Sequence, residues 1–392
     1  MKSRVSLWTL FAIFLKIGST AFGGFMALIA VVQKEAVERR RWLKQDDMLN
    51  GVSLATILPG PVAVNVVAYV GHRLRGGPGA FVAAVGVILP SFLLILGLSA
   101  AYFYWGSLPT VSRLFQGFVP AVTAIIVSAA WTMGRKSIKG WREALLLAMA
   151  CGLLLGIGGF WTTLAIVVGA GVIGAAFFRK PPSLPQPANK RRGPKAAKRS
   201  RLNSLGLLPF VGAAPFLGFN AALTLKIFST FAGVSLFLFG GGYVFIPFIR
   251  EVVVETHHWL TPQEFVDGIA LGQVTPGPIL ITATFIGYKV AGLAGSIAAT
   301  VGIFLPPALL MIIATHALDR IRHHPVIVAA LAGIRPAVVG MIAAAAVTVG
   351  LSAPVHWVSL AIFAAALLAL VRFRLEVVWI IPAAGLAGLL LY

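Results

Sequence analysis

Charged residues are scarce in this chain. Only 11% of its 392 residues are charged, whereas 59% are hydrophobic, and the mean hydropathy is +0.93. A soluble domain carries about 25% charged residues, so this sequence has too little polar surface to cover a water-soluble particle. At this length, the composition predicts an all-α, polytopic membrane protein with roughly ten or more spans of about 20 residues each.

Cysteine is nearly absent, and so are several catalytic motifs. The single cysteine, Cys151, cannot form an internal disulfide, and no group of side chains has the spacing of a zinc or iron–sulfur site. The chain also lacks a Walker phosphate loop, a nucleophile elbow and an HExxH motif. These absences argue against an ATP-driven pump and a membrane hydrolase, and we expect no metal, cofactor or enzymatic activity.

Acidic residues are also few, since 11 Asp and Glu oppose 32 Lys and Arg for a net charge of +21. Nine of the basic residues fall within residues 179–201, a Pro-rich stretch that contains no acidic residue. Most others lie between apolar runs, which the positive-inside rule predicts for a membrane protein and which disfavours nucleic-acid binding. We therefore expect one module over residues 1–178, a cytoplasmic linker over 179–204 and a second module over 205–392.

The two modules are related in sequence. At an offset of 217 residues (276 minus 59), a Phe-Gly-Gly triplet, a Glu, a Trp and a Pro-Gly-Pro motif recur in order, and further Gly, Pro and Trp positions recur at an offset of 216 (287 minus 71). So many coincidences indicate a duplicated module. The aligned motifs are Phe22-Gly23-Gly24 with Phe239-Gly240-Gly241, and Pro59-Gly60-Pro61 with Pro276-Gly277-Pro278.

Loop charges predict that the two modules are inverted relative to each other. Residues 33–47 hold five Lys and Arg, whereas the equivalent residues 250–264 hold one. This alternation favours inverted repeats about a pseudo-two-fold axis in the membrane plane, as in many secondary transporters. Five crossings plus a re-entrant hairpin over 48–70 would give the inversion. Residues 5–32 form either one crossing or a hairpin broken at the glycine pair, in which case the run 205–219 supplies the additional span.

The Pro-Gly-Pro motifs are candidate breaks in membrane helices. A helix that begins at such a break directs its free N–H groups and the positive end of its dipole into the gap, where they can hold an anion. The N–H groups of residues 63–65 and 280–282 are expected there, with the side chains of Asn65 and Thr282 as further donors. The alternative is a tight turn between two spans. The glycine pairs are either further breaks or sites of close helix packing.

The candidate substrate-binding residues lie at these breaks. They are Gly23, Gly24, Pro59, Gly60, Pro61, Val64, Asn65, Gly240, Gly241, Pro276, Gly277, Pro278, Ile281 and Thr282. Four basic residues within or beside apolar runs could add electrostatic attraction: Lys16, Arg73, Lys289 and Arg335. For Arg73 and Lys289 the alternative is a boundary anchor. The aligned acidic positions, which include Asp47 with Glu264 and Asn50 with Asp267, are expected on solvated faces, so no proton carrier is identified.

These motifs make the chain resemble the chromate transporter family. The resemblance is carried by FGGFMALIAVVQKEAVERRRWL and ILPGPVAVNVVAYVGHRLRGGPGAFVAAVGVILPSF in the first half, and by FGGGYVFIPFIREVVVETHHWL and VTPGPILITATFIGYKVAGLAGSIAATVGIFLPP in the second. It covers about residues 5–178 and 221–391, and it departs from the commoner family pattern at Phe25.

The resemblance implies a multi-pass protein of the bacterial inner membrane that exports chromate, driven by the proton motive force, and so confers chromate resistance. Chromate and sulfate are both tetrahedral dianions, so transport of sulfate or another oxyanion stays open. An anion channel and a homodimer stay open as well.

Overall fold

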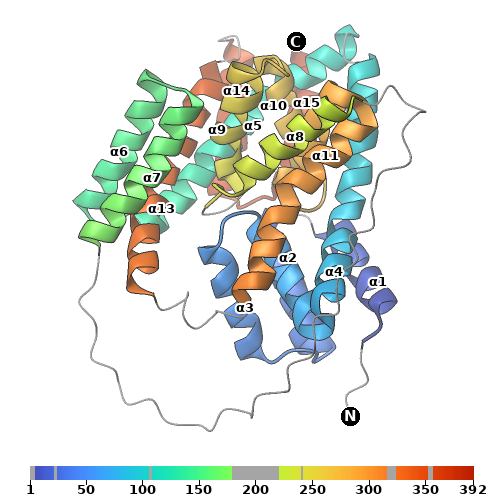
Figure 1. Cartoon of the computed structure of the whole chain (residues 1–392). Coiled ribbons are helices and arrows are strands. Elements are labelled where there is room, and N and C mark those ends of the chain that lie inside the picture. The colour runs from blue at the N-terminus through green and yellow to red at the C-terminus, as the bar shows by residue number, and fades with distance from the viewer. Residues whose placement is uncertain are drawn as a thin grey trace, which may run out of the picture.

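The computed structural model describes residues 5–21, 24–105, 108–178, 220–239, 242–315, 324–351 and 356–392. Within these ranges the chain is helical apart from its connections, which confirms the predicted all-helical class (Figure 1). The linker 179–204 and the run 205–219 lie outside the described residues.

The helices of the first half are α1 Leu7–Thr20, α2 Gly24–Gln33, the π-helical turn η1 Lys34–Arg39, α3 Gln45–Ile57, α4 Val62–Trp105, α5 Pro109–Ser137, α6 Trp141–Gly156 and α7 Phe160–Phe177. Those of the second half are α8 Ala221–Ser235, η2 Gly242–Val244, α9 Phe245–Arg250, the π-helical turn η3 Glu251–Thr256, α10 Pro262–Val274, η4 Ile279–Ile281, α11 Thr282–Thr315, α13 Pro325–Leu351, α14 Trp357–Val371 and α15 Val377–Leu391.

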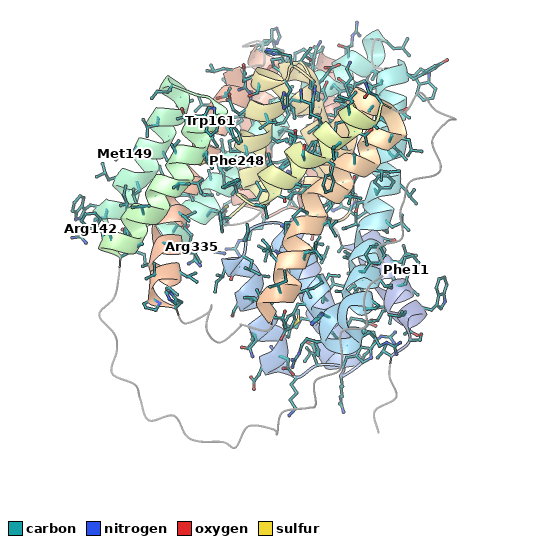
Figure 2. The ribbon with its side chains drawn as sticks, in the orientation of Figure 1. Phe11, Arg142, Met149, Trp161, Phe248 and Arg335 are labelled. Atoms are coloured by element: carbon teal, nitrogen blue, oxygen red, sulfur yellow. The ribbon has the colours of Figure 1, made fainter. Side chains whose placement is uncertain are left out.

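Among the described residues, five helices are long and apolar enough to cross a membrane, and four shorter helices are also apolar. Large apolar side chains cover much of the outer surface. Met149 on α6 and Trp161 on α7, for example, lie exposed at the edge of the molecule (Figure 2). Exposed apolar faces of this extent require a lipid solvent, so the chain is a multi-pass membrane protein.

Each of α4 and α11 consists of two antiparallel segments. Non-helical backbone at Arg75 and Gly76 breaks α4, and the equivalent Ala291 and Gly292 break α11. In α11, Ser296 donates a hydrogen bond to the Thr284 carbonyl (3.0 Å), although residues 12 apart on a straight helix are about 18 Å from each other. We call residues 62–74 and 282–290 the short segments, and 77–105 and 293–315 the return segments.

Equivalent helices make equivalent contacts. α1 packs on α4 as α8 packs on α11, while α6 and α7 pack on α13 as α14 and α15 pack on α5. The last two pairings join one half to the other, so the halves interlock along α5 and α13. The equivalent helices α3 and α10 lie at opposite ends of the molecule, α3 at the bottom and α10 at the top of Figure 1.

The apolar run 5–32 is not one continuous helix. α1 ends at Thr20, Ala21 has non-helical backbone, and α2 begins at Gly24. The run is therefore interrupted between α1 and α2, while the hairpin and the additional span over 205–219 stay predictions. Gly24 is the first residue of α2, whereas Gly23, Gly240 and Gly241 lie outside the described residues, so their proposed part in a site stays a prediction.

Candidate functional site

The two Pro-Gly-Pro motifs meet in the interior of the molecule. Gly60 and Gly277 have nearly identical backbone angles, with φ of 100° and 106°, in a region that favours glycine because other residues place a Cβ against their own backbone. The Gly60 N–H donates to the Leu238 carbonyl at 2.7 Å, and the Gly277 N–H donates to the Ala21 carbonyl at 3.1 Å. Each break is thus held by the break region of the other half.

Side chains repeat this reciprocity. The Ser91 hydroxyl, on the return segment of α4, donates to the Pro276 carbonyl. A Cβ on Gly277 would collide with Ser91, and a Cβ on Gly60 would collide with Pro307, which occupies the position equivalent to Ser91 on the return segment of α11. The return segment of each half therefore packs directly on the Pro-Gly-Pro motif of the other.

A helix start follows each motif, and its first-turn amides lack acceptors within the helix. All residues from 61 to 71 are buried, so the start of α4 is enclosed by protein. The Asn65 N–H donates to the Pro61 carbonyl, which leaves the earlier amides of residues 62–64 facing the break rather than those of 63–65. In the second half the Ile281 N–H donates to Pro278, which leaves those of residues 279 and 280.

One small cavity of about 70 Å³ contacts both motifs. The first half contributes Pro61, Val62 and Ala63, and the second contributes residues of η2, of the end of α10 and of the segment 277–280. Val377 and Val378 of α15 close it. Among the described residues no charged side chain lines this cavity, so N–H groups and helix dipoles are what it offers an anion.

The predicted side-chain donors point elsewhere. Asn65 donates through Nδ2 to the Pro59 carbonyl (3.1 Å), and the Thr282 hydroxyl donates to the Ile279 carbonyl (2.9 Å). Neither side chain lines the cavity, nor do Val64 and Ile281. Asn65 and Thr282 instead bond to the backbone of their own breaks, Asn65 at the Pro59 carbonyl and Thr282 at the Ile279 carbonyl.

Three polar residues of the second half take the place of these donors. Tyr243, Gln273 and Thr275 line the cavity. Tyr243 lies beside Gln273 and interacts with its side-chain amide, but within the described residues the buried Nε2 of Gln273 has no hydrogen bond of ordinary geometry. A buried N–H donor without a partner is costly, and an anion would satisfy it. Sequence comparison of the halves missed these residues because their counterparts, Met26, Thr56 and Leu58, are different residue types.

The four basic candidates lie outside the cavity. Arg73 pairs with Asp47 (2.9 Å), and the equivalent Lys289 pairs with Glu264 (2.7 Å), which matches the anchor alternative for both. Lys16 is exposed on α1, away from the cavity to which it was expected to attract an anion. Arg335 is exposed on α13 (Figure 2). An exposed cation at the bilayer surface is stabilised by snorkelling.

One carboxylate is buried, contrary to the expectation of a solvated face. Asp267 is only 2% exposed, and it lies on α10, a helix of 13 residues that is too short to cross a membrane. Its Oδ2 accepts a hydrogen bond from the Tyr102 hydroxyl (2.7 Å), and its Oδ1 accepts one from Gln263 Nε2 (2.8 Å). Burial raises the pKa of this carboxyl to about 7, although both hydrogen bonds oppose the shift.

Helical membrane proteins in which two related halves bring broken helices together around a small buried cavity form a recognised class of transporter. Comparison with known proteins specifies the family. The sequence profile of the family described as "Chromate transporter" matches residues 8–175 and 225–389. The chain belongs to the chromate transporter family, which confirms the resemblance, and is therefore a transporter rather than an enzyme.

Several relatives align over most of their length. The chain is 31% identical to a chromate transport protein of Cupriavidus metallidurans over 97% of this chain and 92% of the relative. It is 33% identical to a chromate transport protein of Pseudomonas aeruginosa over 98% and 92%, and 34% identical to an uncharacterised transporter of Methanocaldococcus jannaschii over 91% and 87%. No solved structure matches the chain.

Proposed function

We propose that this protein exports chromate across the inner membrane in exchange for protons and thereby confers chromate resistance. The observation that carries the proposal is the meeting of the two Pro-Gly-Pro motifs at one cavity lined by residues of both halves. The names of the relatives from Cupriavidus metallidurans and Pseudomonas aeruginosa support chromate as the substrate.

The size and chemistry of the cavity suit a small oxyanion. A volume of about 70 Å³ equals the liquid volume of about two water molecules, which limits the occupant to a small ion. Two helix starts and the Nε2 of Gln273 supply N–H donors, and the fixed dipoles favour negative charge without a permanent counter-ion. A site of neutral donors can release the anion more readily than a buried ion pair can.

Alternating access follows if the two halves are inverted repeats. The placement of α3 and α10 at opposite ends of the molecule supports this arrangement (Figure 1), as do the reciprocal hydrogen bonds of Gly60 and Gly277. In this proposal each short segment, with the helix before it, forms a re-entrant hairpin whose tip reaches the midplane. Rocking of the halves about the two tips would expose the cavity to each side in turn.

The test is flux of radiolabelled chromate and sulfate in proteoliposomes with an imposed pH gradient, against protein-free liposomes. We expect chromate accumulation driven by the pH gradient, and uphill proton movement driven by a chromate gradient. An anion channel would conduct chromate but would not move protons uphill. Preference for sulfate would reassign the substrate, and the absence of flux for either anion would refute the proposal.

A further inference from the structure

The buried carboxylate of Asp267 joins the two halves of the protein. Asp267 belongs to α10 in the second half, whereas its partner Tyr102 lies near the end of the return segment of α4 in the first. Rings from three elements surround this contact: Tyr102 packs edge-on against Phe115 of α5 at 4.9 Å and against Phe285 of α11 at 5.3 Å. The enclosure keeps water from the carboxylate, which is why its ionised form is disfavoured.

Few other charged or titratable groups face Asp267. On α10 itself there is Glu264, whose charge disfavours ionisation of Asp267, beside the uncharged amide of Gln263, which donates to the carboxylate. From α11, Lys289 is nearby but is paired with Glu264. From α4 there is Tyr102. Arg113, on the neighbouring turn of α5, is exposed, and α15 has no titratable side chain. No cation therefore neutralises Asp267 directly among the described residues.

A polar hollow next to this contact offers a route for protons. A solvent-accessible pocket of about 510 Å³ is lined by Glu255, His258, Glu264 and Lys289, among others. Glu264 precedes Asp267 by three residues, so the two carboxylates lie on adjacent turns of one helix face. A separation of α10 from Tyr102 would open Asp267 toward this pocket, with Glu264 between them.

The same helix leads from Asp267 to the anion cavity. Gln273 lies six residues further along α10, which is about 9 Å on a helix, and lines the cavity. A displacement of α10 that opens the contact with Tyr102 therefore also moves one wall of the anion site. The equivalent position in the first half is Asn50. Asparagine cannot titrate, so a titratable carboxylate at this position belongs to the second half alone.

We propose that Asp267 is the proton-carrying residue of the exchange, which deepens the function proposed above and rests on it. A protonated Asp267 allows the halves to close on Tyr102 without an anion. An ionised Asp267 opposes closure, because closure would bury its charge. An anion that bridges the amides of the two helix starts offsets this cost and allows closure. Either a proton or an anion thus permits the same closure, and one exchanges for the other across the membrane.

The experiment compares Asp267→Asn with the wild type in proteoliposomes, in two modes. The amide is permanently neutral and nearly isosteric, so the empty protein can close without a proton. We expect downhill chromate flux to persist, while accumulation driven by a pH gradient falls to the level of protein-free liposomes. Asp46→Asn is the matched control, because Asp46 is an exposed carboxylate of the equivalent helix α3, and we expect it to keep wild-type coupling.

Other outcomes also decide the question. Accumulation by Asp267→Asn at the wild-type level would overturn the proposal, as would a folded variant that is inactive in both modes. If the variant does not fold, Tyr102→Phe decides, since it retains the carboxylate but removes a donor. We then expect the pH midpoint of coupled flux to rise by about one to two units, and an unchanged midpoint would overturn the proposal. Absence of chromate flux in the wild type would instead refute the proposed function.

Discussion

Alanine substitution of the two break glycines tests whether their geometry forms the site. Gly60 and Gly277 have φ near 100°, and forcing a residue with a Cβ into such a region costs about 1–3 kcal/mol. The added methyl also collides with the opposite half, which costs about a further 1–3 kcal/mol. We expect each variant to lose about 2–6 kcal/mol of unfolding free energy, and to lose chromate flux.

The two collisions differ in kind, so the two variants should not be equal. Gly60 faces the rigid ring of Pro307, whereas Gly277 faces the hydroxyl of Ser91. Ser91→Ala should therefore recover part of the stability lost in Gly277→Ala by removing the clash, but not the part that comes from backbone strain. We expect Gly60→Ala to be the more damaging single change, because the proline ring cannot rotate away.

The assays are thermal unfolding in detergent and chromate flux in proteoliposomes. Gly152→Ala is the control, because Gly152 lies within α6 with no atom near the added methyl, and alanine there should stabilise the helix by about 0.5–1 kcal/mol. Wild-type unfolding and flux in Gly60→Ala would show that the break does not need its geometry. Full recovery of Gly277→Ala by Ser91→Ala would refute the strain argument.

Three polar groups give further predictions. Gln273→Leu should raise the KM for chromate roughly 2- to 12-fold, because it removes a donor worth about 0.5–1.5 kcal/mol. Thermal stability should not fall, since the substitution also removes a buried amide without a hydrogen bond of ordinary geometry, and an unchanged KM would exclude Gln273 from the site. Burial raises the pKa of Asp267 from 3.8 to about 7, so the folded protein holds that proton more tightly than the unfolded chain. This contribution to stability is complete below about pH 4 and is lost as the pH rises through about 7. Unfolding temperatures measured across this range should decline less in Asp267→Asn than in the wild type, and equal slopes would contradict the burial argument. A double-mutant cycle on Asp47 and Arg73 should yield a coupling energy of only about 0.2–1 kcal/mol, with little change in the KM for chromate. A large rise in KM on loss of Arg73 would show that Arg73 acts on the substrate and is not only an anchor.

Proton coupling in this proposal depends on an asymmetry between two related halves. The ion pairs Asp47–Arg73 and Glu264–Lys289 are equivalent and nearly equal in length, so they anchor the short segments in the same way. Asp267 has no titratable counterpart, since Asn50 occupies the equivalent position. A proton site at one end alone allows proton binding to respond to the conformation that exposes that end.

Much of the fold could be predicted from composition and repetition. The shortage of charge requires lipid around the helices, and the recurrence of Pro-Gly-Pro at a constant offset identifies two equivalent breaks. Proline and glycine act locally, through a missing N–H and an allowed positive φ, so their effect on the backbone is readable from the chain. Pro61, Gly277 and Pro278 accordingly line the cavity.

Side-chain roles were decided by packing between segments that are distant in sequence. Nothing local distinguishes Asn65, which bonds to its own break, from Gln273, which lines the cavity. The sequence predicts that Asp267 faces solvent near a helix start. In the structure Tyr102, which is 165 residues away in the chain, covers it. The sequence by itself determined that the chain is a duplicated membrane protein with paired helix breaks. Only the tertiary structure decided which polar groups face the cavity and which carboxylate is buried, because both depend on contacts between the two halves.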